Sequence, residues 1–170
     1  EDSAMIARIR ALPAVAAVSI TLEETAIFEY DDPPGAGIMK GVDEQYSNVN
    51  SIDSALIEGS FKLQDDETIY AVLGSGMARN LSVDVLNVFQ NLSIHMPARQ
   101  QKGGFQKPYQ TRFLKPAGVF AIQQDIDNQY VLIPLAVARS LLDRPGAISS
   151  MEIKLQPDAD EDSAKAEIAR

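Results

Sequence analysis

The chain has 170 residues and a mass of 18.5 kDa, with 45% apolar and 23% charged residues. This composition is typical of a globular domain with a core of its own, and it excludes wholesale disorder. The net charge of −9 argues against general nucleic-acid binding, which depends on neutralising phosphates. No apolar run approaches the roughly 20 residues that a membrane-spanning helix needs.

The charge is divided unevenly along the chain. Residues 85–124 contain five basic residues and no acidic one, so this segment carries a charge of +5. The rest of the chain holds 10 basic and all 24 acidic residues, so its net charge is −14. Such a split is typical of an interaction surface, although Lys and Arg on edge strands also serve to prevent aggregation.

The N-terminal part predicts a helix followed by a β-hairpin. Ser3 is a suitable N-cap, and apolar residues at helical spacing continue until Pro13 ends the helix. From Val18 to Tyr30, apolar and polar residues alternate, which predicts a long half-buried strand. A turn cluster at 31–35 and a second strand around 38–42 complete the hairpin.

The middle of the chain predicts a second, longer hairpin. A strand over 88–96 and a strand over 109–122, bent near 116–118, flank a polar loop at 97–108. Before this hairpin we expect a short helix lined by apolar residues of 49–57 and capped by Gly59, a buried strand at 69–73 and a short helix at 77–81.

The C-terminal part continues with short elements of both kinds. We expect a turn at 125–128, a buried strand at 130–133, a helix with Pro134 as its first residue, a half-buried strand at 151–155 and a helix from Ala164. Helices and strands follow each other without the regular β–α–β alternation of a parallel sheet. The sequence therefore predicts the α+β class.

Ser75 and His95 are the candidates for catalysis. Ser75 lies in a Gly-Ser-Gly turn between a strand and a helix, but Leu73 stands where a nucleophile elbow needs glycine, so we expect only a tight turn. His95 is the only histidine, and no carboxylate lies near it in sequence, so we expect a solvated surface side chain. The chain has no cysteine. We expect no catalytic residue, no cofactor and no metal.

The polar loop between the strands of the longer hairpin is the candidate contact site for a partner. Arg99, Lys102 and Lys107 supply three of the five basic residues of the segment, and Phe105 lies among them. Basic and aromatic residues together also suit single-stranded nucleic acid, but a protruding basic hairpin fits an acidic or amphipathic protein partner better on a chain of this net charge. These four residues are the predicted partner-binding residues.

Several segments follow one another in the order and spacing of a known family. They read RALPAVAAVSITLEETAIF, GIMKGVDEQY, LIEGSFKL, AVLGSGMARNLSVDVLNVFQNLSIHMP, FLKPAGVFAIQQDIDNQYVLIPLAVARSLL and ISSMEIKL. Together they resemble the extracytoplasmic core domain of ABC transporter permeases of the MacB/FtsX superfamily, most of all the lipoprotein-releasing permeases LolC and LolE. Two departures are that Leu86-Asn87 stands where the family usually has Gly-Asp, and that the family's domain continues beyond the position of Arg170.

The resemblance implies an architecture and a set of partners. It implies a mixed α/β base, approximately 1–47 and 123–170, with an inserted strand-rich subdomain at about 48–122. It implies a domain on the periplasmic side of the bacterial inner membrane that works with a cytoplasmic ATPase subunit and a second permease subunit. In LolC-like members a hairpin loop hooks a periplasmic lipoprotein carrier, and the loop at 97–108 is its counterpart by position.

We therefore expect a non-catalytic extracytoplasmic domain of an ABC transporter permease. It would transmit conformational change or contact cargo or a periplasmic carrier, in lipoprotein release or MacB-like export. A free-standing periplasmic protein-binding module is the first alternative. A hydrolase that uses Ser75 or His95 is a more remote one.

Overall fold

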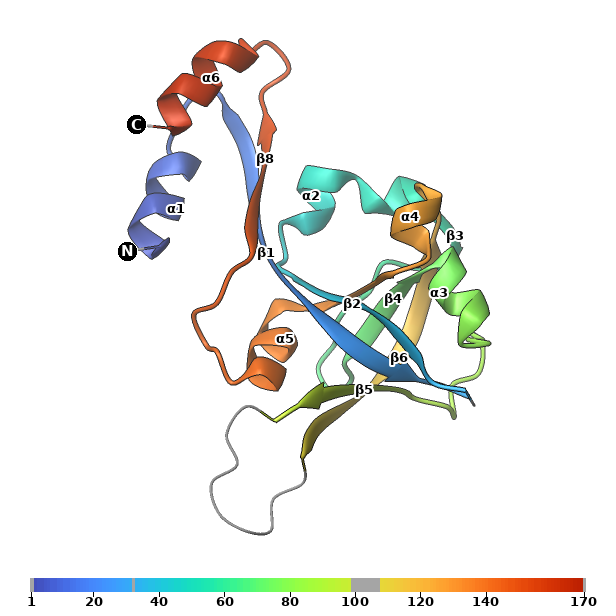
Figure 1. Cartoon of the computed structure of the whole chain (residues 1–170). Coiled ribbons are helices and arrows are strands. Elements are labelled where there is room, and N and C mark those ends of the chain that lie inside the picture. The colour runs from blue at the N-terminus through green and yellow to red at the C-terminus, as the bar shows by residue number, and fades with distance from the viewer. Residues whose placement is uncertain (1, 32, 99–107, 170) are drawn as a thin grey trace.

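The long strand predicted in the N-terminal part organises the fold. In the computed structural model, which describes residues 2–31, 33–98 and 108–169, this strand is β1 and runs from Val15 to Glu29 (Figure 1). Its C-terminal half points Leu22, Ala26 and Phe28 into the core and leaves the alternate side chains outside. The alternation of the sequence is therefore the alternation of a strand with one buried face.

The remaining elements follow in chain order around β1. The helices are α1 (Asp2–Arg10), α2 (Tyr46–Asn50), the 3-10 turn η1 (Ile52–Ala55), α3 (Ser75–Asn80), α4 (Gln124–Asp127), α5 (Leu135–Leu142) and α6 (Glu161–Ile168). The other strands are β2 (Gly35–Val42), β3 (Leu56–Gly59), β4 (Tyr70–Gly74), β5 (Leu92–Pro97), β6 (Tyr109–Phe120), β7 (Tyr130–Pro134) and β8 (Ser150–Leu155).

Six of these strands close into a barrel. Hydrogen-bonded neighbours follow the order β1–β2–β7–β4–β6–β5, and β5 pairs again with β1. Two pairs, β2–β7 and β4–β6, are parallel, and the others are antiparallel. β3 adds to the edge of β6 next to its bulge. The mixed sheet confirms the α+β class predicted from the sequence.

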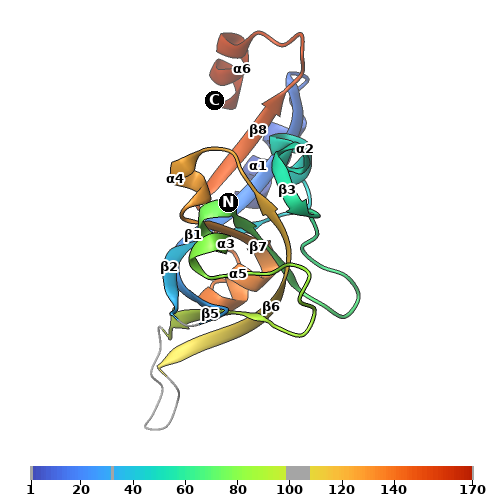
Figure 2. The same cartoon turned by 90° about the vertical axis from the view of Figure 1, so that its right-hand side faces the viewer.

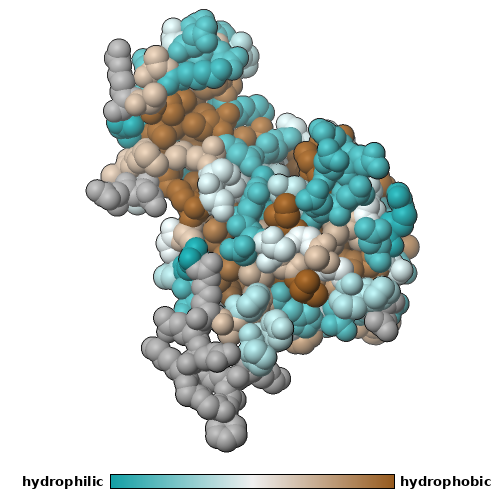
Figure 3. Space-filling view, viewed as in Figure 1, coloured by the Kyte–Doolittle hydropathy of each residue, from teal (hydrophilic) through white to brown (hydrophobic). Residues whose placement is uncertain are grey.

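The N-terminal half of β1 leaves the barrel and pairs with β8. This ribbon, with α1 and α6 packed beside it, forms an extension that we call the arm (Figures 1 and 2). The arm has a small apolar cluster of its own around Ile9, Val15 and Val18. Apolar side chains colour much of the arm's surface in Figure 3, because several members of this cluster stay half-buried.

The barrel has one core inside and a second one on its outer wall. Side chains of α3 and α5 join the inward residues of the strands in the larger core, which includes Phe28, Met39 and Ile94. The second core lies under α2 and η1, where Tyr46, Ile52 and Phe120 are buried together. The barrel wall between the two cores is therefore apolar on both faces.

Most predicted elements are confirmed, including both hairpins, and three details differ. The helix predicted over 49–57 is only partly confirmed, because α2 and η1 are helical over 46–50 and 52–55, whereas Leu56 and Ile57 belong to β3 and pair with β6. Gly59 ends that strand instead of capping a helix, and its φ of 68° together with the closeness of Ala117 requires a glycine. A long-range pairing has overridden a local apolar pattern here.

The other two differences concern element ends. β5 starts at Leu92 and not near Val88, and the preceding residues 86–89 form a loop whose Leu86 and Phe89 are largely exposed. The expected turn at 125–128 is instead α4, a single helical turn whose buried Asp127 accepts a hydrogen bond from the backbone N–H of Ile122. Short apolar or polar runs do not by themselves distinguish these states.

Candidate functional site

The stem of the longer hairpin is built by β5 and β6. The two strands pair antiparallel from Leu92–Leu114 to Pro97–Tyr109. Leu92, Ile94 and Met96 are buried in the barrel, as the sequence pattern predicts. The stem therefore projects from a rigid barrel wall, at the end of the molecule opposite the arm (Figures 1 and 2).

The outward face of the stem combines aromatic and polar side chains. Tyr109 is 56% exposed and Phe113 is 65% exposed, on alternate positions of β6. Ile27 of the neighbouring strand β1 is also exposed. Aromatic side chains in such positions are typical of contact surfaces for other proteins. This face belongs to the described part of the hairpin.

The predicted partner-binding residues Arg99, Lys102, Phe105 and Lys107 lie outside the described residues. The two remaining basic residues of the segment are described, and both have partners within the chain. Arg112 donates a hydrogen bond to the Ser140 hydroxyl at 3.0 Å, and Lys115 donates one to the carbonyl of Val88 at 2.9 Å. These two basic residues hold the stem against α5 and the loop at 86–89.

His95 lies on the outward face of the stem, where the sequence placed it, but it has partners that the sequence did not indicate. Its Nε2 is 3.1 Å from Oε2 of Glu29 on β1, and its Nδ1 is 2.9 Å from Oγ1 of Thr111 on β6. The side chain is 27% exposed. These contacts link the adjacent strands β1, β5 and β6 on the outward face of the stem. Glu29, His95 and Thr111 therefore have a structural role.

The Gly-Ser-Gly turn at Ser75 has a packing explanation. A Cβ at Gly74 would lie 2.4 Å from the carbonyl oxygen of Asp127, and one at Gly76 would lie closer still to Asn128. Both glycines therefore let the start of α3 pack directly on α4, as expected for a tight turn. Within the described residues, no group of three or more His, Cys, Asp or Glu side chains is arranged to hold a metal ion.

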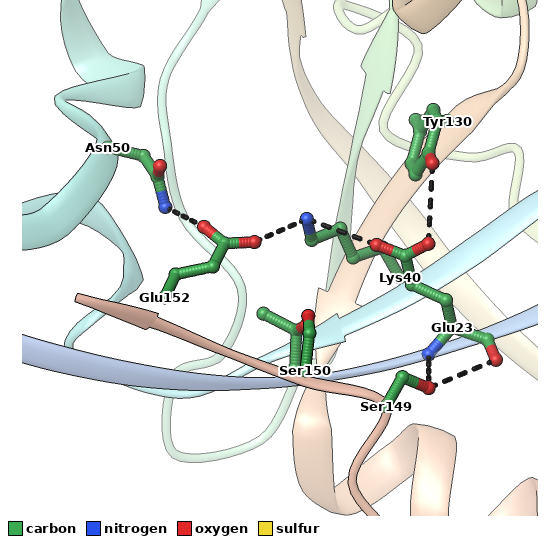
Figure 4. Close-up of polar contacts among 8 residues, drawn as sticks. Glu23, Lys40, Asn50, Tyr130, Ser149, Ser150 and Glu152 are labelled. Atoms are coloured by element: carbon green, nitrogen blue, oxygen red, sulfur yellow. Dashed lines mark hydrogen bonds and ion pairs between the residues drawn. The ribbon is translucent and has the colours of Figure 1, made fainter. Parts of the chain in front are cut away.

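A partly buried lysine forms a polar cluster on the outer barrel wall, which sequence reasoning missed (Figure 4). Nζ of Lys40 on β2 is 2.7 Å from Oε1 of Glu152 on β8 and 3.2 Å from Oε1 of Glu23 on β1. The side chain of Lys40 is only 13% exposed. Asn50 of α2 donates a hydrogen bond to the other oxygen of Glu152, and the Tyr130 hydroxyl donates one to Glu23. The cluster thus joins the arm to the barrel.

The charges of this cluster are set by burial and by its ion pairs. Burial alone would lower the pKa of Lys40, but the hydrogen bond and charge of Glu152 and the hydrogen bond of Glu23 outweigh it, so the pKa is raised. Burial raises the pKa of Tyr46 and of Tyr130, whose rings lie 5.4 and 5.9 Å from Nζ of Lys40. Lys40 is therefore a permanent cation between two carboxylates. The sequence feature that could have indicated this cluster is a single Lys between Met39 and Gly41 in an otherwise apolar strand.

The fold is shared with solved domains of transporter proteins. The structure is similar to the periplasmic region of MacB from Actinobacillus actinomycetemcomitans. The TM-score of this match is 0.62 and the sequence identity is 12%, and the match covers 98% of this chain and 70% of the other. It is similar to the extracellular domain of the noncanonic ABC-type transporter YknZ from Gram-positive bacteria, with a TM-score of 0.66, 12% identity and coverage of 96% and 76%. The TM-scores of 0.62 and 0.66 show that the chain shares its fold with these two domains.

The particular family follows from the sequence itself. The family model of the MacB-like periplasmic core domain matches residues 1–170, and the chain belongs to this family. A domain described as part of a permease protein from Porphyromonas gingivalis is also similar, with 21% identity, a TM-score of 0.54 and coverage of 89% of this chain and 61% of the other. No helix within residues 2–31, 33–98 and 108–169 is long and apolar enough to cross a membrane.

Proposed function

We propose that this chain is the non-catalytic, extracytoplasmic domain of an ABC transporter permease, held on the periplasmic side of the bacterial inner membrane. Membership of the MacB-like periplasmic core domain family is the observation that carries the proposal. The transporter would include a cytoplasmic ATPase subunit and a second permease subunit. The domain would transmit conformational change between them and a periplasmic partner.

The positions of the arm and the hairpin stem support a role in transmitting conformational change. The arm contains both described ends of the chain, and the stem of the basic hairpin lies at the opposite end of the barrel (Figure 1). A partner that binds the hairpin would therefore meet the part of the domain farthest from the arm. The proposed division is a base at about 1–47 and 123–170 and an inserted segment at about 48–122, which contains the hairpin, and strands of both parts share the barrel.

The finer proposal concerns lipoprotein release. Arg99, Lys102, Phe105 and Lys107 would contact a periplasmic lipoprotein carrier or another acidic periplasmic protein. The local charge of +5 without any acidic residue supports an acidic partner, and the exposed Tyr109 and Phe113 on the stem would extend the contact. Rim charges of this kind chiefly raise the association rate and make binding depend on salt.

Charge reversal in the hairpin tests the proposal. Arg99→Glu, Lys102→Glu and Lys107→Glu, combined in the permease, should lower the association rate with the purified lipoprotein carrier at least about tenfold at low salt, and less at moderate salt. Surface plasmon resonance with immobilised permease measures both rates.

A matched control reverses the same number of charges elsewhere. Arg79→Glu, Lys62→Glu and Lys165→Glu change exposed basic residues outside the hairpin and should leave the association rate unchanged. Equal binding by the hairpin variant and the unmodified permease would rule out the hairpin as the carrier contact. Membership of the family would stand in either case.

A further inference from the structure

A cleft of about 550 Å³ lies between α1 of the arm and α5 of the barrel. Its lining includes Ile6, Ala7 and Arg10 of α1, Arg139 of α5 and Ile148 from the loop between α5 and β8. The cleft therefore lies where two parts of the molecule meet, which is a common place for a small-molecule site. Its volume falls within the range of roughly 300–1,000 Å³ that such sites occupy.

The lining combines apolar side chains with positive charge. Ile6, Ile20 and Ile148 contribute apolar surface, and each is half-buried. Within the described residues, the charged members of the lining are Arg10 and Arg139, so the cleft carries a charge of +2. Apolar walls together with an excess of positive charge favour a ligand that has an apolar body and an anionic group.

Arg139 has hydrogen-bond donors to spare. Its Nε donates to the carbonyl of Ala147 at 3.0 Å, which fixes the guanidinium on the loop after α5. Its two terminal nitrogens have no hydrogen-bond or ion-pair partner in the part of the chain that the structure describes. A guanidinium held in this way suits a carboxylate, because the two planar groups can form parallel N–H···O bonds.

Arg10 lies near one carboxylate, which is already bound elsewhere. Its Nη2 is 3.8 Å from Oδ2 of Asp43, which is beyond hydrogen-bond distance. That oxygen accepts a hydrogen bond from the backbone N–H of Ile20 at 3.1 Å. Oδ1 accepts one from the Ser19 hydroxyl at 2.7 Å and one from the backbone N–H of Gln45 at 3.1 Å. Arg10, whose side chain is 48% exposed, therefore keeps its donors for a ligand.

A second hollow adjoins the cleft and differs from it in charge. Its volume is about 460 Å³, and it shares Arg10, Ile20 and Arg139 with the cleft. Asp43 and Glu44 line this hollow but do not line the cleft. Negative charge therefore disfavours an anion in the hollow, and the cleft beside α1 is the place where the two arginines can bind one.

We propose that this cleft binds small organic anions, with the anionic group on Arg10 and Arg139 and the apolar body on Ile6 and Ile148. Such a ligand would contact the arm and the barrel at the same time, because Arg10 belongs to α1 and Arg139 to α5. The inference concerns a site away from the hairpin and does not depend on the proposed transport role.

Four probes separate the effect of charge from that of apolar contact. Hexanoate, 1-hexanol, hexylammonium and acetate are titrated into the isotope-labelled 170-residue chain at neutral pH, and amide chemical shifts are followed by NMR. Hexanoate should shift amides of the lining residues and bind about tenfold more tightly than 1-hexanol, a difference of about 1.4 kcal/mol. Acetate lacks the apolar body and hexylammonium has the opposite charge, so neither should bind measurably.

Two tryptophan variants locate the site. Ala7→Trp places a large ring in the cleft and should abolish the shifts caused by hexanoate. Ala136→Trp places the same ring in the adjoining hollow and should leave these shifts intact. Both alanines are exposed, so neither ring has to enter a core. The fold of each variant is checked by its amide spectrum outside the altered helix.

Two charge variants test the role of the arginines. Arg10→Gln removes one of the two cations of the lining, so it should weaken hexanoate binding about tenfold and bring it close to that of 1-hexanol. Arg8→Gln is the matched control, because Arg8 lies in the same last turn of α1 but does not line the cleft. This control should bind hexanoate as the unmodified chain does.

Several results would overturn the proposal. These are an absence of shifts with hexanoate, shifts scattered over the surface, equal binding of hexanoate and hexylammonium, full binding by a folded Ala7→Trp variant, or equal losses in Arg8→Gln and Arg10→Gln. Loss of binding in Ala136→Trp alone would also contradict it, because the ligand would then lie in the hollow. The carrier experiment with the hairpin variant is read separately, so failure of one proposal is distinguishable from failure of the other.

Discussion

Lys40 shows how one residue connects distant parts of the chain. Its ammonium joins carboxylates that lie 17 positions before it and 112 positions after it, on β1 and β8. Taking three charges partly out of water is costly, and the cost is offset only while all of them are paired. The cluster is therefore more important for holding β8 in one position than for net stability.

Replacing Lys40 should show how far the fold depends on this cluster. We expect Lys40→Met to lower the free energy of unfolding by about 3 kcal/mol, because two half-buried carboxylates lose their counter-charge. Urea denaturation followed by circular dichroism measures the change. Lys165→Met, which breaks an exposed pair with Glu161, is the control and should hardly move the midpoint.

The pH dependence of the Lys40 cluster has a definite sign. Because the pKa of Lys40 is raised in the folded state, its contribution is fully present below the ordinary lysine pKa of about 10.4 and is lost only as pH rises through the folded value. The cost of Lys40→Met should therefore be constant from neutral pH to about pH 9. A cost that shrinks steadily over this range would contradict the ion-pair explanation.

At the scale of elements, close backbone contacts decide how the short helices pack. α3 and α4 have six and four residues, too few to form a stable helix alone. They are held because Gly74 and Gly76 allow the backbone of α4 to approach. Local sequence therefore predicts the short helix at 77–81 and a turn at 125–128, and packing determines that this second segment is also a helical turn.

A single methyl group should disturb this contact. We expect Gly74→Ala to destabilise the chain by about 2–3 kcal/mol, since its Cβ would meet the backbone of Asp127 and neither side can move easily. Gly146→Ala is the matched control, because nothing lies within 4 Å of a Cβ there. Thermal unfolding of both variants measures the difference, and equal melting temperatures would show that α4 yields freely.

The N-terminus of α6 provides a second test at this scale. The side chain of Asp160 accepts a hydrogen bond from the backbone N–H of Ser163 at 2.8 Å, and hydrogen bonds from Ser163 lower the pKa of this carboxyl. A lowered folded pKa means that the stabilisation is present above the ordinary value of about 3.9 and is lost as pH falls through the folded value.

We therefore expect α6 to fray on acidification. Amide exchange of residues in α6 should accelerate below about pH 4 in the unmodified chain. Asp160→Ala should show fast exchange at all pH values, because the N-cap is gone. Asp158→Ala, in the loop before the helix, is the control and should behave as the unmodified chain. Slow exchange of α6 in Asp160→Ala would show that the packing of α6 on the arm keeps the helix folded without its N-cap.

At the scale of the whole molecule, the chain consists of a well-packed barrel and a thinner arm. The barrel has an apolar core inside and another outside its wall, whereas the arm has one small cluster with most members half-buried. Regions with few buried apolar contacts open at lower free energy than the core. The arm should therefore move as a unit against the barrel.

Native-state hydrogen exchange measures this difference. Amides of β8 and of the first half of β1 should exchange through openings of lower free energy than those of β4, β6 and β7. Lys40→Met should lower protection in β8 further and leave β4 nearly unchanged, because the cluster ties β8 to the barrel. Uniform protection across arm and barrel would show that the molecule opens only as a whole.

The sequence by itself determined the α+β class, both hairpins, most strands and the uneven charge, because alternation, turn residues and charge are local properties that can be read along the chain. The family resemblance added the extracytoplasmic core domain. Residues 99–107, with the predicted contact residues, remain a prediction from sequence.

Only the tertiary structure decided the rest. The closure of six strands into a barrel, the strand at Leu56 and the Lys40 cluster all depend on residues far apart in the chain. No local pattern specifies which strand edge or which carboxylate a residue will meet. The net charge of −9 and the basic hairpin were evident from composition, whereas the ion pairs of Lys40 with Glu23 and Glu152 form only once β1, β2 and β8 are brought together by folding.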